Sequence, residues 1–579
     1  MSTSDKHNER IASIKKNMKR YLNLLAIVLV NFICTIYANG QEIKGLNLEG
    51  LEDKIESLVP NAVKDSTPGL VIGIFQNEEL IFSKGYGMAN LSYNISNSPE
   101  MLYNLGSVSK QFLGYAFAIL QSEGKVNIDD PVGEYLDNWP EFNQKVTIRH
   151  LLSHTSGYRE AYSMSELAGR TIGIDRLTRD ECLEVVRRQA KLEFAPGSRF
   201  TYNSTAWVIL AEILERVTEQ SAHAWVTENV LVPMGMKTAH IESFVGEVIP
   251  NAAESYYFEK GLGYGAPKSN RAIFGAADVY ASINDIFHWF SNFQTQKVGN
   301  ESVMDIFLSP YELNDGTSTQ YGFGIRNSMH KGLKLYSHTG AHESFLTQLR
   351  YYPENNFGII AISNFEGNGW IATNQIAEYV LAEYMTFFEK IKHKAFDISM
   401  EQIKQLEGTY LSPYRNEVTN LAIINDTLTI WGGMQIIPIS ENRFYSKSWG
   451  GEFEFIKKEG HSTQLIIAYE PVWAIGTGVT ESKYQKVDEW TPSLKDLKKY
   501  ESSYRSKELE TNYTIILKGN QLAIQHRWLG EIGLTPITDD MFRSDQDWFV
   551  EFRRSKTNEI IGFNINSNRT LNVFFEKNK

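Results

Sequence analysis

The sequence has little cysteine, which excludes a fold held together by disulfides. Cys34 and Cys182 are the two cysteines among 579 residues, and Cys34 lies in an N-terminal apolar segment that we expect to be cleaved. The one remaining thiol cannot form an intrachain disulfide, even in an oxidising compartment. The chain also lacks a Gly-x-x-x-x-Gly-Lys phosphate loop. Its 42% hydrophobic content is typical of a soluble protein with several well-filled cores.

Positive charge is also scarce. The chain has 57 Lys and Arg against 69 Asp and Glu, for a formal net charge of −12. An acidic surface disfavours nucleic acid and anionic membranes as partners. His338 and His342 stand four residues apart, but Gly340 between them and the strand-like surroundings argue against a metal pair on a helix. The sequence therefore predicts no nucleic-acid partner, no metal site and no cofactor.

One uncharged apolar run, Tyr21–Tyr37, stands out near the N-terminus. It contains two asparagines and is short for a membrane-spanning helix. Basic residues precede it, and Ala38-Asn39-Gly40 supplies small residues for cleavage before Gln41. We therefore expect residues 1–40 to be a secretory signal peptide, with Met18 as an alternative start. This predicts a periplasmic or secreted protein with no stable membrane anchor after cleavage.

Ser107–Lys110 (Ser-Val-Ser-Lys) is the pattern that indicates chemistry most directly. The same Ser-x-x-Lys spacing occurs at Ser13–Lys16 and Ser328–Lys331, so the motif alone decides nothing. Gly106 precedes Ser107, and apolar residues then recur at helical spacing. We expect a helix to begin at Ser107, with Lys110 on the same face and able to share the hydroxyl proton. The helix N-terminus would also favour the negative charge that develops during attack.

Tyr202, in Phe-Thr-Tyr-Asn-Ser, is the second candidate for proton transfer. Serine is a weak nucleophile at neutral pH, so it needs a nearby base and a group that reprotonates the leaving group. A lysine and a phenol in contact can exchange a proton at modest cost because their ordinary pKa values lie close together. The sequence leaves open which of Lys110 and Tyr202 is the base. His154 lies in a turn of small hydroxyl residues and glycine, and we interpret it as structural.

Several further stretches occur in the order and spacing of a known family. Residues 50–385 resemble the serine β-lactamase and penicillin-binding protein superfamily, in particular the branch of class C β-lactamases, D-alanyl-D-alanine carboxypeptidases and related esterases. Besides the motifs above, the stretches that carry the resemblance are Leu151–Gly157, Ala195–Phe200, Pro233–Met236, Tyr321–Gly324, His338–Gly340 and the Asn364 region. The resemblance implies an α+β, β-lactamase/transpeptidase-like fold, with an antiparallel sheet flanked by helices plus a helical subdomain.

Three local signals in this domain predict secondary structure. Residues 68–90 predict a hairpin around Gln76–Glu79, and Ser282–Asp285 predicts a capping box at the start of a helix. A helical run is expected to end at Tyr384–Phe388, before the charged stretch Glu389–Lys394.

By this resemblance, Ser107 is the acylated nucleophile, Lys110 its partner, and Tyr202 the general base or proton relay. The implied protein is a serine hydrolase that forms an acyl-enzyme and hydrolyses D-amino-acid peptides, esters or, as the least expected class, β-lactams. Its partner would be a small-molecule or peptide substrate, for which the cell wall is one source. The alternative is a penicillin-binding-like sensor, or a protein that binds cell wall or another ligand, with little turnover.

The resemblance also implies that His338, Thr339 and Gly340 form a strand that lines the site. The backbone N–H groups of the nucleophile and of Ala341 would then form an oxyanion hole. Two positions depart from the family: Ser204 stands where Asn is usual, and His338 where β-lactamases usually have Lys. A histidine that is mostly neutral at pH 7 removes a permanent anchor for a substrate carboxylate. Esterase or peptidase activity is therefore expected ahead of penicillin hydrolysis.

The C-terminal part of the chain carries an internal repeat. Leu406–Ser412 aligns with Tyr500–Ser506 at an offset of 94 residues, and Leu428–Ile430 aligns with Leu522–Ile524 at the same offset. Alternating apolar residues broken by turn signals predict two small all-β antiparallel modules. The domains expected after the signal peptide are a hydrolase domain at 41–390, a linker at 391–400, and β modules at 401–490 and 491–579.

The string Ala468–Gly478 resembles the active-site signature of triosephosphate isomerase, with Glu470 in the place of the catalytic base. That activity requires a barrel of about 250 residues in which strands and helices alternate. The string lies instead in a short, strand-rich region. We interpret it as a loop insertion in the first β module, and we do not predict isomerase activity.

Overall fold

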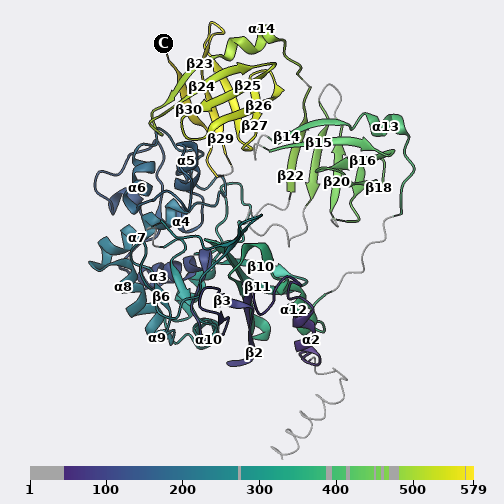
Figure 1. Ribbon diagram of the computed structural model, residues 1–579. Helices are drawn as coiled ribbons and strands as arrows, with labels where there is room; N and C mark the ends of the chain where they lie inside the picture. The colour runs from purple at the N-terminus through teal and green to yellow at the C-terminus, as the bar shows by residue number, and fades with distance from the viewer. Residues whose placement is uncertain are drawn as a thin grey trace, which may run out of the picture.

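The computed structural model (Figure 1) describes residues 45–271, 275–386, 394–412, 417–448, 451–457, 462–468, 481–488, 490–567 and 569–578. The predicted signal peptide and the isomerase-like residues Tyr469–Gly478 lie outside these ranges. Within them, the search for a helix with the length and hydropathy of a membrane span found none.

A six-stranded antiparallel sheet forms the centre of the N-terminal domain (residues 45–386), in the order β10-β11-β12-β13-β1-β2. The hairpin expected around residues 76–79 is confirmed, because β1 pairs with β2 and the turn residues Asn77 and Glu78 adopt positive φ angles. The strands are β1 Leu70–Gln76, β2 Glu79–Tyr86, β10 Arg326–His330, β11 Leu333–His342, β12 Phe345–Tyr352 and β13 Phe357–Ser363.

Side chains of β1 alternate between two hydrophobic cores, as successive residues of a strand must. Leu70 and Ile74 pack with helices α2 (Leu51–Glu56) and α12 (Thr373–Val380) on one face of the sheet. Val71 belongs to the larger core on the other face, to which two long helices contribute. These helices are α3 Lys110–Ser122 and α10 Ile283–Thr295. The expected arrangement of a sheet flanked by helices is therefore confirmed.

Two helix ends test the local sequence signals. The capping box predicted at the start of α10 is present, because Ser282 accepts a hydrogen bond from the Asp285 N–H and the Asp285 carboxylate accepts one in return. The helical run expected to reach Phe388 is wrong for Leu381–Tyr384, which form turns after α12 ends at Val380. The chain turns there because the Thr386 N–H donates to the Lys331 carbonyl, 2.7 Å away, beside the β10–β11 turn.

Most of the helical subdomain is formed by residues between β2 and β10 in the sequence. Its helices α5 and α6 lie next to the C-terminal β module (Figure 1). Its helices are α4 Ile148–Leu152, α5 Ala161–Leu167, α6 Arg179–Arg187, α7 Thr205–Thr218, α8 Ala222–Val226 and α9 Val232–Met234, with α11 Glu301–Leu308 further on. Short strands of the same domain are β3 Met88–Asn90, β4 Ile95–Ser96, β5 Tyr103–Asn104, β6 His240–Ile241, β7 Tyr257–Glu259, β8 Gly263–Gly265 and β9 Val279–Ala281.

The first β module follows helix α13 (Met400–Lys404) and is a nine-stranded antiparallel sheet with its own hydrophobic core. The edge strands β17 and β18 are separated by the single residue Ile436, so they continue one another along the chain. The strands are β14 Gly408–Ser412, β15 Glu417–Ile424, β16 Thr427–Ile430, β17 Met434–Gln435, β18 Ile437–Pro438, β19 Arg443–Tyr445, β20 Glu452–Ile456, β21 Gln464–Ala468 and β22 Glu481–Lys486.

The second β module follows α14 (Leu494–Leu497) and is a closed antiparallel barrel in which β23 pairs with β30. We call it the barrel. Its strands are β23 Ser502–Ser506, β24 Thr511–Lys518, β25 Gln521–His526, β26 Gly530–Thr538, β27 Met541–Ser544, β28 Phe549–Arg554, β29 Ile560–Asn566 and β30 Val573–Lys577. The prediction of two small all-β antiparallel modules is therefore confirmed.

The internal repeat has a physical counterpart in matching hydrogen bonds. The buried Tyr410 hydroxyl donates to the Leu406 carbonyl at 2.8 Å, and the buried Tyr504 hydroxyl donates to the Tyr500 carbonyl at 2.8 Å. Each bond ties the first strand of a module to the turn before it. The repeat in sequence thus encodes the same local anchor twice.

The barrel shares a hydrophobic core with the N-terminal domain. Met164 and Leu167 of α5 belong to the same buried cluster as the barrel residues. The Tyr513 hydroxyl also donates to the Leu167 carbonyl at 2.6 Å. Burial of apolar surface across this contact fixes the barrel against α5.

Candidate active site

Ser107 lies in a 3₁₀ turn, Gly106–Ser109, that leads directly into α3. Gly106 has φ +53°, and a Cβ added to it would lie 2.6 Å from the Ala341 nitrogen. A Cβ on Gly340 would lie 2.0 Å from the Leu105 carbonyl oxygen. Both glycines are therefore needed for the 3₁₀ turn and β11 to approach backbone to backbone. This approach brings the backbone of Ser107 close to that of Ala341.

Lys110 is completely buried beside the candidate nucleophile. Its Nζ lies 3.2 Å from Ser107 Oγ and donates to the Ala276 carbonyl at 2.6 Å. Burial lowers the pKa of Lys110, and the positive charge of Arg569 lowers it further, while Tyr202 opposes the shift. A lysine with a lowered pKa holds more neutral amine at pH 7, which can accept the serine proton.

Tyr202 lies next to Lys110, just before α7. The Lys110 Nζ is 5.1 Å from the centroid of its ring. Within the described ranges the buried Tyr202 hydroxyl has no hydrogen-bond partner, and Tyr202 lines the cavity described below. His154 packs on the same ring with centroids 4.2 Å apart, and its Nδ1 accepts from the Asn203 N–H at 3.0 Å. His154 thus orients the Tyr202 segment, in line with its structural interpretation.

His338 on β11 is buried and belongs to a hydrogen-bonded chain. Its Nδ1 lies 2.6 Å from the Thr339 carbonyl oxygen, so Nδ1 carries the proton and Nε2 accepts from the Tyr321 hydroxyl at 2.9 Å. The Tyr321 oxygen also lies 3.3 Å from Nε2 of His154. Burial, followed by the charge of Lys110, lowers the pKa of His338 to about 3. The imidazole is therefore neutral at pH 7, and β11 provides no cation at this position.

Ser204 stands at the start of α7 and lines the same cavity. The neighbouring Asn203 cannot replace the carboxamide that the family usually has at position 204. Its Nδ2 donates to the carbonyls of Tyr158 and Arg159, and its Oδ1 accepts from the Ala206 N–H. A hydroxyl is therefore the polar group offered to a substrate at this place.

These residues surround one cavity of about 500 Å³, a size that suits a small ligand. The predicted residues Ser107, Lys110, Tyr202, Ser204, His338, Thr339 and Ala341 all line it, while the buried Gly340 acts through the close backbone approach. Its other lining residues are Tyr162, Arg199, Phe200, Thr201, Arg271, Ala276, Ala277, Arg326, His342, Trp370, Glu417 and Arg569.

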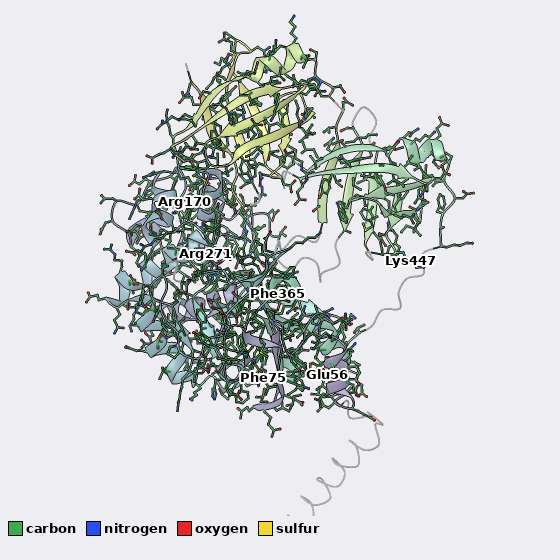
Figure 2. The ribbon with its side chains drawn as sticks, in the orientation of Figure 1. Glu56, Phe75, Arg170, Arg271, Phe365 and Lys447 are labelled. Atoms are coloured by element: carbon green, nitrogen blue, oxygen red, sulfur yellow. The ribbon has the colours of Figure 1, made fainter. Side chains whose placement is uncertain are left out.

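The cavity is more cationic than the sequence reasoning anticipated. Arg271 lies within the N-terminal domain, below the barrel (Figure 2), and forms an ion pair with Glu343. Arg326 stacks on the rings of Phe200 and Tyr321, with its Cζ 5.9 and 5.5 Å from their centroids. No short motif marks these arginines, because their roles depend on strands and loops that meet only in the folded chain.

Both β modules also reach the cavity, through Glu417 and Arg569. Arg569 lies in the β29–β30 connection of the barrel, and its Cζ is 5.2 Å from the centroid of the Tyr202 ring. The following residues are tied to the N-terminal domain, because Arg159 donates to the Leu571 carbonyl and the Glu160 N–H lies 3.2 Å from Thr570 Oγ1. Sequence reasoning missed Arg569, which has no local motif.

Comparison with known proteins gives relatives of the N-terminal domain. The D-aminopeptidases of Brucella anthropi and Brucella canis are each 27% identical over 310 residues, which are 52% of this chain and 56% and 57% of theirs. The chain thus matches little more than half the length of these curated relatives. The octameric penicillin-binding protein homologue from Pyrococcus abyssi shares the fold, with a TM-score of 0.50, 21% identity, and coverage of 76% of this chain and 100% of that one.

Two family descriptions match the sequence. Triosephosphate isomerase matches residues 445–515, but the described part of that segment contains antiparallel strands of the first β module and the beginning of the barrel. An isomerase barrel requires parallel strands that alternate with helices, so this match does not indicate that fold. The beta-lactamase family matches residues 53–382, more than half of the chain, including the motifs that surround the cavity. The chain belongs to the beta-lactamase family.

Proposed function

We propose that the protein is a serine hydrolase that cleaves amide or peptide bonds of D-amino acids through an acyl-enzyme on Ser107. The observation that carries this proposal is the 3.2 Å approach of the buried Lys110 Nζ to Ser107 Oγ, beside Tyr202 and at the wall of a cavity. The D-amino-acid substrate class is supported by the relatives named D-aminopeptidase. The charge and small residues around positions 15–40 support export of the protein from the cytoplasm.

The first half of the reaction forms an ester. Ser107 Oγ attacks the carbonyl carbon while its proton passes to Lys110 or Tyr202. The backbone N–H groups of Ser107 and Ala341 donate to the oxyanion, and these fixed donors stabilise the negative charge that develops there. The C–N bond then breaks, and the amine leaves with a proton delivered from Tyr202 or Lys110.

The second half returns the enzyme to its initial state. A water molecule attacks the ester carbonyl, loses a proton to the same lysine–tyrosine pair, and displaces Ser107 Oγ, which takes that proton back. The products are the acid and the free serine hydroxyl. The neutral state of His338 suits it to accept from Tyr321 and hold β11 in place, rather than to anchor an anion.

D-alanine p-nitroanilide and its L enantiomer provide the test, with intact mass recorded beside the release of nitroaniline. We expect turnover of the D enantiomer and a loss of at least about 10⁴-fold in Ser107→Ala. Ser328→Ala is the matched control, because Ser328 on β10 and Lys331 in the turn after it repeat the Ser-x-x-Lys spacing outside the cavity. Turnover that survives in Ser107→Ala would contradict the mechanism. A Ser107-dependent mass shift without turnover would support the sensor instead.

A further inference from the structure

Arg569 is the arginine that the barrel places at the cavity. Its guanidinium Cζ lies 5.2 Å from the centroid of the Tyr202 ring, and the side chain is half-buried. Among the described residues, no carboxylate lies within ion-pair distance of it. A guanidinium that faces a cavity without an internal counter-ion matches the planar geometry of a ligand carboxylate.

The position of Arg569 is set by the residues that follow it. Arg159 is 1% exposed, donates to the carbonyls of Leu571 and Asn572, and forms ion pairs with two carboxylates. These carboxylates come from both sides of the contact: Glu193 from the N-terminal domain at 3.1 Å and Glu508 from the barrel at 2.8 Å. Such a buried network holds the loop, so Arg569 is presented to the cavity by a fixed backbone.

The other cations of the cavity are Lys110, Arg199, Arg271 and Arg326, and each of them already has interaction partners. Lys110 donates to the Ala276 carbonyl and lies beside Ser107, and Arg271 is paired with Glu343. Arg326 is 6% exposed and stacked on two aromatic rings. The acidic lining residue is Glu417, whose carboxylate accepts from the Tyr484 hydroxyl at 2.8 Å.

The neighbour of Arg569 defines which part of a substrate it meets. Under the proposed function, the lysine–tyrosine pair delivers a proton to the leaving nitrogen, so a group above the Tyr202 ring faces the leaving side of the scissile bond. In a peptide, an α-carboxylate of the leaving residue is two bonds from that nitrogen. The neutral His338 on β11 does not supply a cation for this carboxylate.

We propose that Arg569 binds the free α-carboxylate of the leaving residue, so that the preferred substrates are short peptides cleaved next to their C-terminal residue. This inference rests on the proposed function and adds a specificity-determining residue to it. The barrel is then part of the substrate site, because it supplies the cation that the N-terminal domain does not offer at this place.

The test compares D-Ala-D-Ala with D-Ala-D-Ala-amide, which share the acyl group and differ only in the charge of the leaving residue. For the wild-type protein we expect kcat/KM to favour the free acid by about 10- to 100-fold, the range for a charged hydrogen bond. In Arg569→Gln this ratio should fall to near one, chiefly through KM. Arg569→Lys, which keeps the charge, should retain part of the preference.

Two further variants test whether the change in substrate preference is specific to Arg569. Arg527→Gln is the matched control, because Arg527 is an exposed barrel arginine stacked on Trp528, with its Cζ 5.1 Å from the ring centroid, and does not line the cavity. It should leave both rates unchanged. Arg326→Gln should leave the ratio intact even if both rates fall. A ratio that follows Arg326 instead, or that stays unchanged in Arg569→Gln, would overturn the inference.

Failure of the inference can be told apart from failure of the proposed function. D-alanine p-nitroanilide has no carboxylate, so its Ser107-dependent hydrolysis reports on the chemistry alone. If that hydrolysis occurs and wild-type protein shows no preference for the free acid, the role of Arg569 is refuted and the hydrolase stands. If none of the three substrates is turned over, both are refuted.

Discussion

The two β modules share a repeat but differ in how they relate to the N-terminal domain. The barrel contributes to a hydrophobic cluster that includes Met164 and Leu167 of α5. The cluster of the first module contains, among the described residues, only residues of that module and of the segment leading into it. Both modules nevertheless line the cavity, with Arg569 from the barrel and Glu417 from the first module. A common strand pattern therefore does not dictate a common docking surface.

The connection before the last strand shows the difference most clearly. In the barrel, β29 ends at Asn566 and β30 begins at Val573, and the short connection brings Arg569 to Tyr202. In the first module, β21 ends at Ala468 and β22 begins at Glu481, so the corresponding connection is longer. The loop insertion inferred from the sequence falls in this connection, at residues 469–480, which lie outside the described ranges. At this position of the repeat, the barrel has a short connection held by Arg159, and the first module has a longer stretch of sequence between its last two strands.

The largest expected effect is on the free energy of unfolding, when the buried charge of Arg159 is removed from the contact between the barrel and the N-terminal domain. Arg159→Met leaves Glu193 and Glu508 largely buried without their cation, so we expect it to lower the free energy of unfolding by about 3–5 kcal/mol. Denaturant unfolding measures this. Arg188→Met is the control, because its pair with Glu510 at the same contact is exposed and should cost less than about 1 kcal/mol. Equal losses in the two variants would mean that the buried network does not hold the barrel.

Truncating one buried side chain at the same repeat position in each β module tests which of the two modules supports the active site. Leu421 and Ile515 stand 94 residues apart, on β15 and β24, and both are buried. Leu421→Ala and Ile515→Ala should each destabilise their own module by about 2–5 kcal/mol. Only Ile515→Ala should also lower kcat/KM for D-Ala-D-Ala, because the barrel core continues into α5 and supports the Arg569 loop. A similar loss of activity in Leu421→Ala would show that both modules position the site.

The pH dependence of activity tests the charge that the barrel brings to Lys110. In the route where the neutral Lys110 amine accepts the serine proton, kcat/KM should rise with pH through the lowered pKa of Lys110. Arg569→Gln removes a cation that lowers this pKa, so the acidic limb should move to higher pH. The other groups around the Lys110 amine are unchanged, namely Tyr202, Asp278, Ser107, the Ala276 carbonyl, and His154, His338 and His342, whose pKa values are lowered by burial. The pH–rate profile for the p-nitroanilide measures this, and a limb that does not move would exclude electrostatic coupling.

The smallest effect is expected at the residue from the first module. Glu417 is exposed, so its charge is screened by solvent. Glu417→Gln should raise kcat/KM for D-Ala-D-Ala by less than about threefold, because it removes a negative charge near an anionic substrate. Steady-state kinetics on the free acid and the amide measure it. A larger effect than that of Arg569→Gln would reverse the order of importance of the two modules.

Local patterns in the sequence predicted the parts of the site that local geometry builds. Ser107 and Lys110 are three residues apart, and their approach follows from one helical turn, although this turn is a 3₁₀ turn at Gly106–Ser109 and α3 begins only at Lys110. The hairpin at Asn77 and the capping box at Ser282 are equally local. Where the prediction of a helix to Phe388 was wrong, a distant group decided, because Thr386 bonds to Lys331.

Sequence alone determined the family, the serine–lysine pair, and the repeated β modules, because each depends on spacing within one element or on a recurring strand pattern. The tertiary structure decided the electrostatics of the cavity. Burial makes His338 neutral and lowers the pKa of Lys110, and neither desolvation can be read from neighbours in sequence. Arg569 reaches Tyr202 only because Arg159 fixes a loop from the far end of the chain, and such a contact exists only once the barrel has docked.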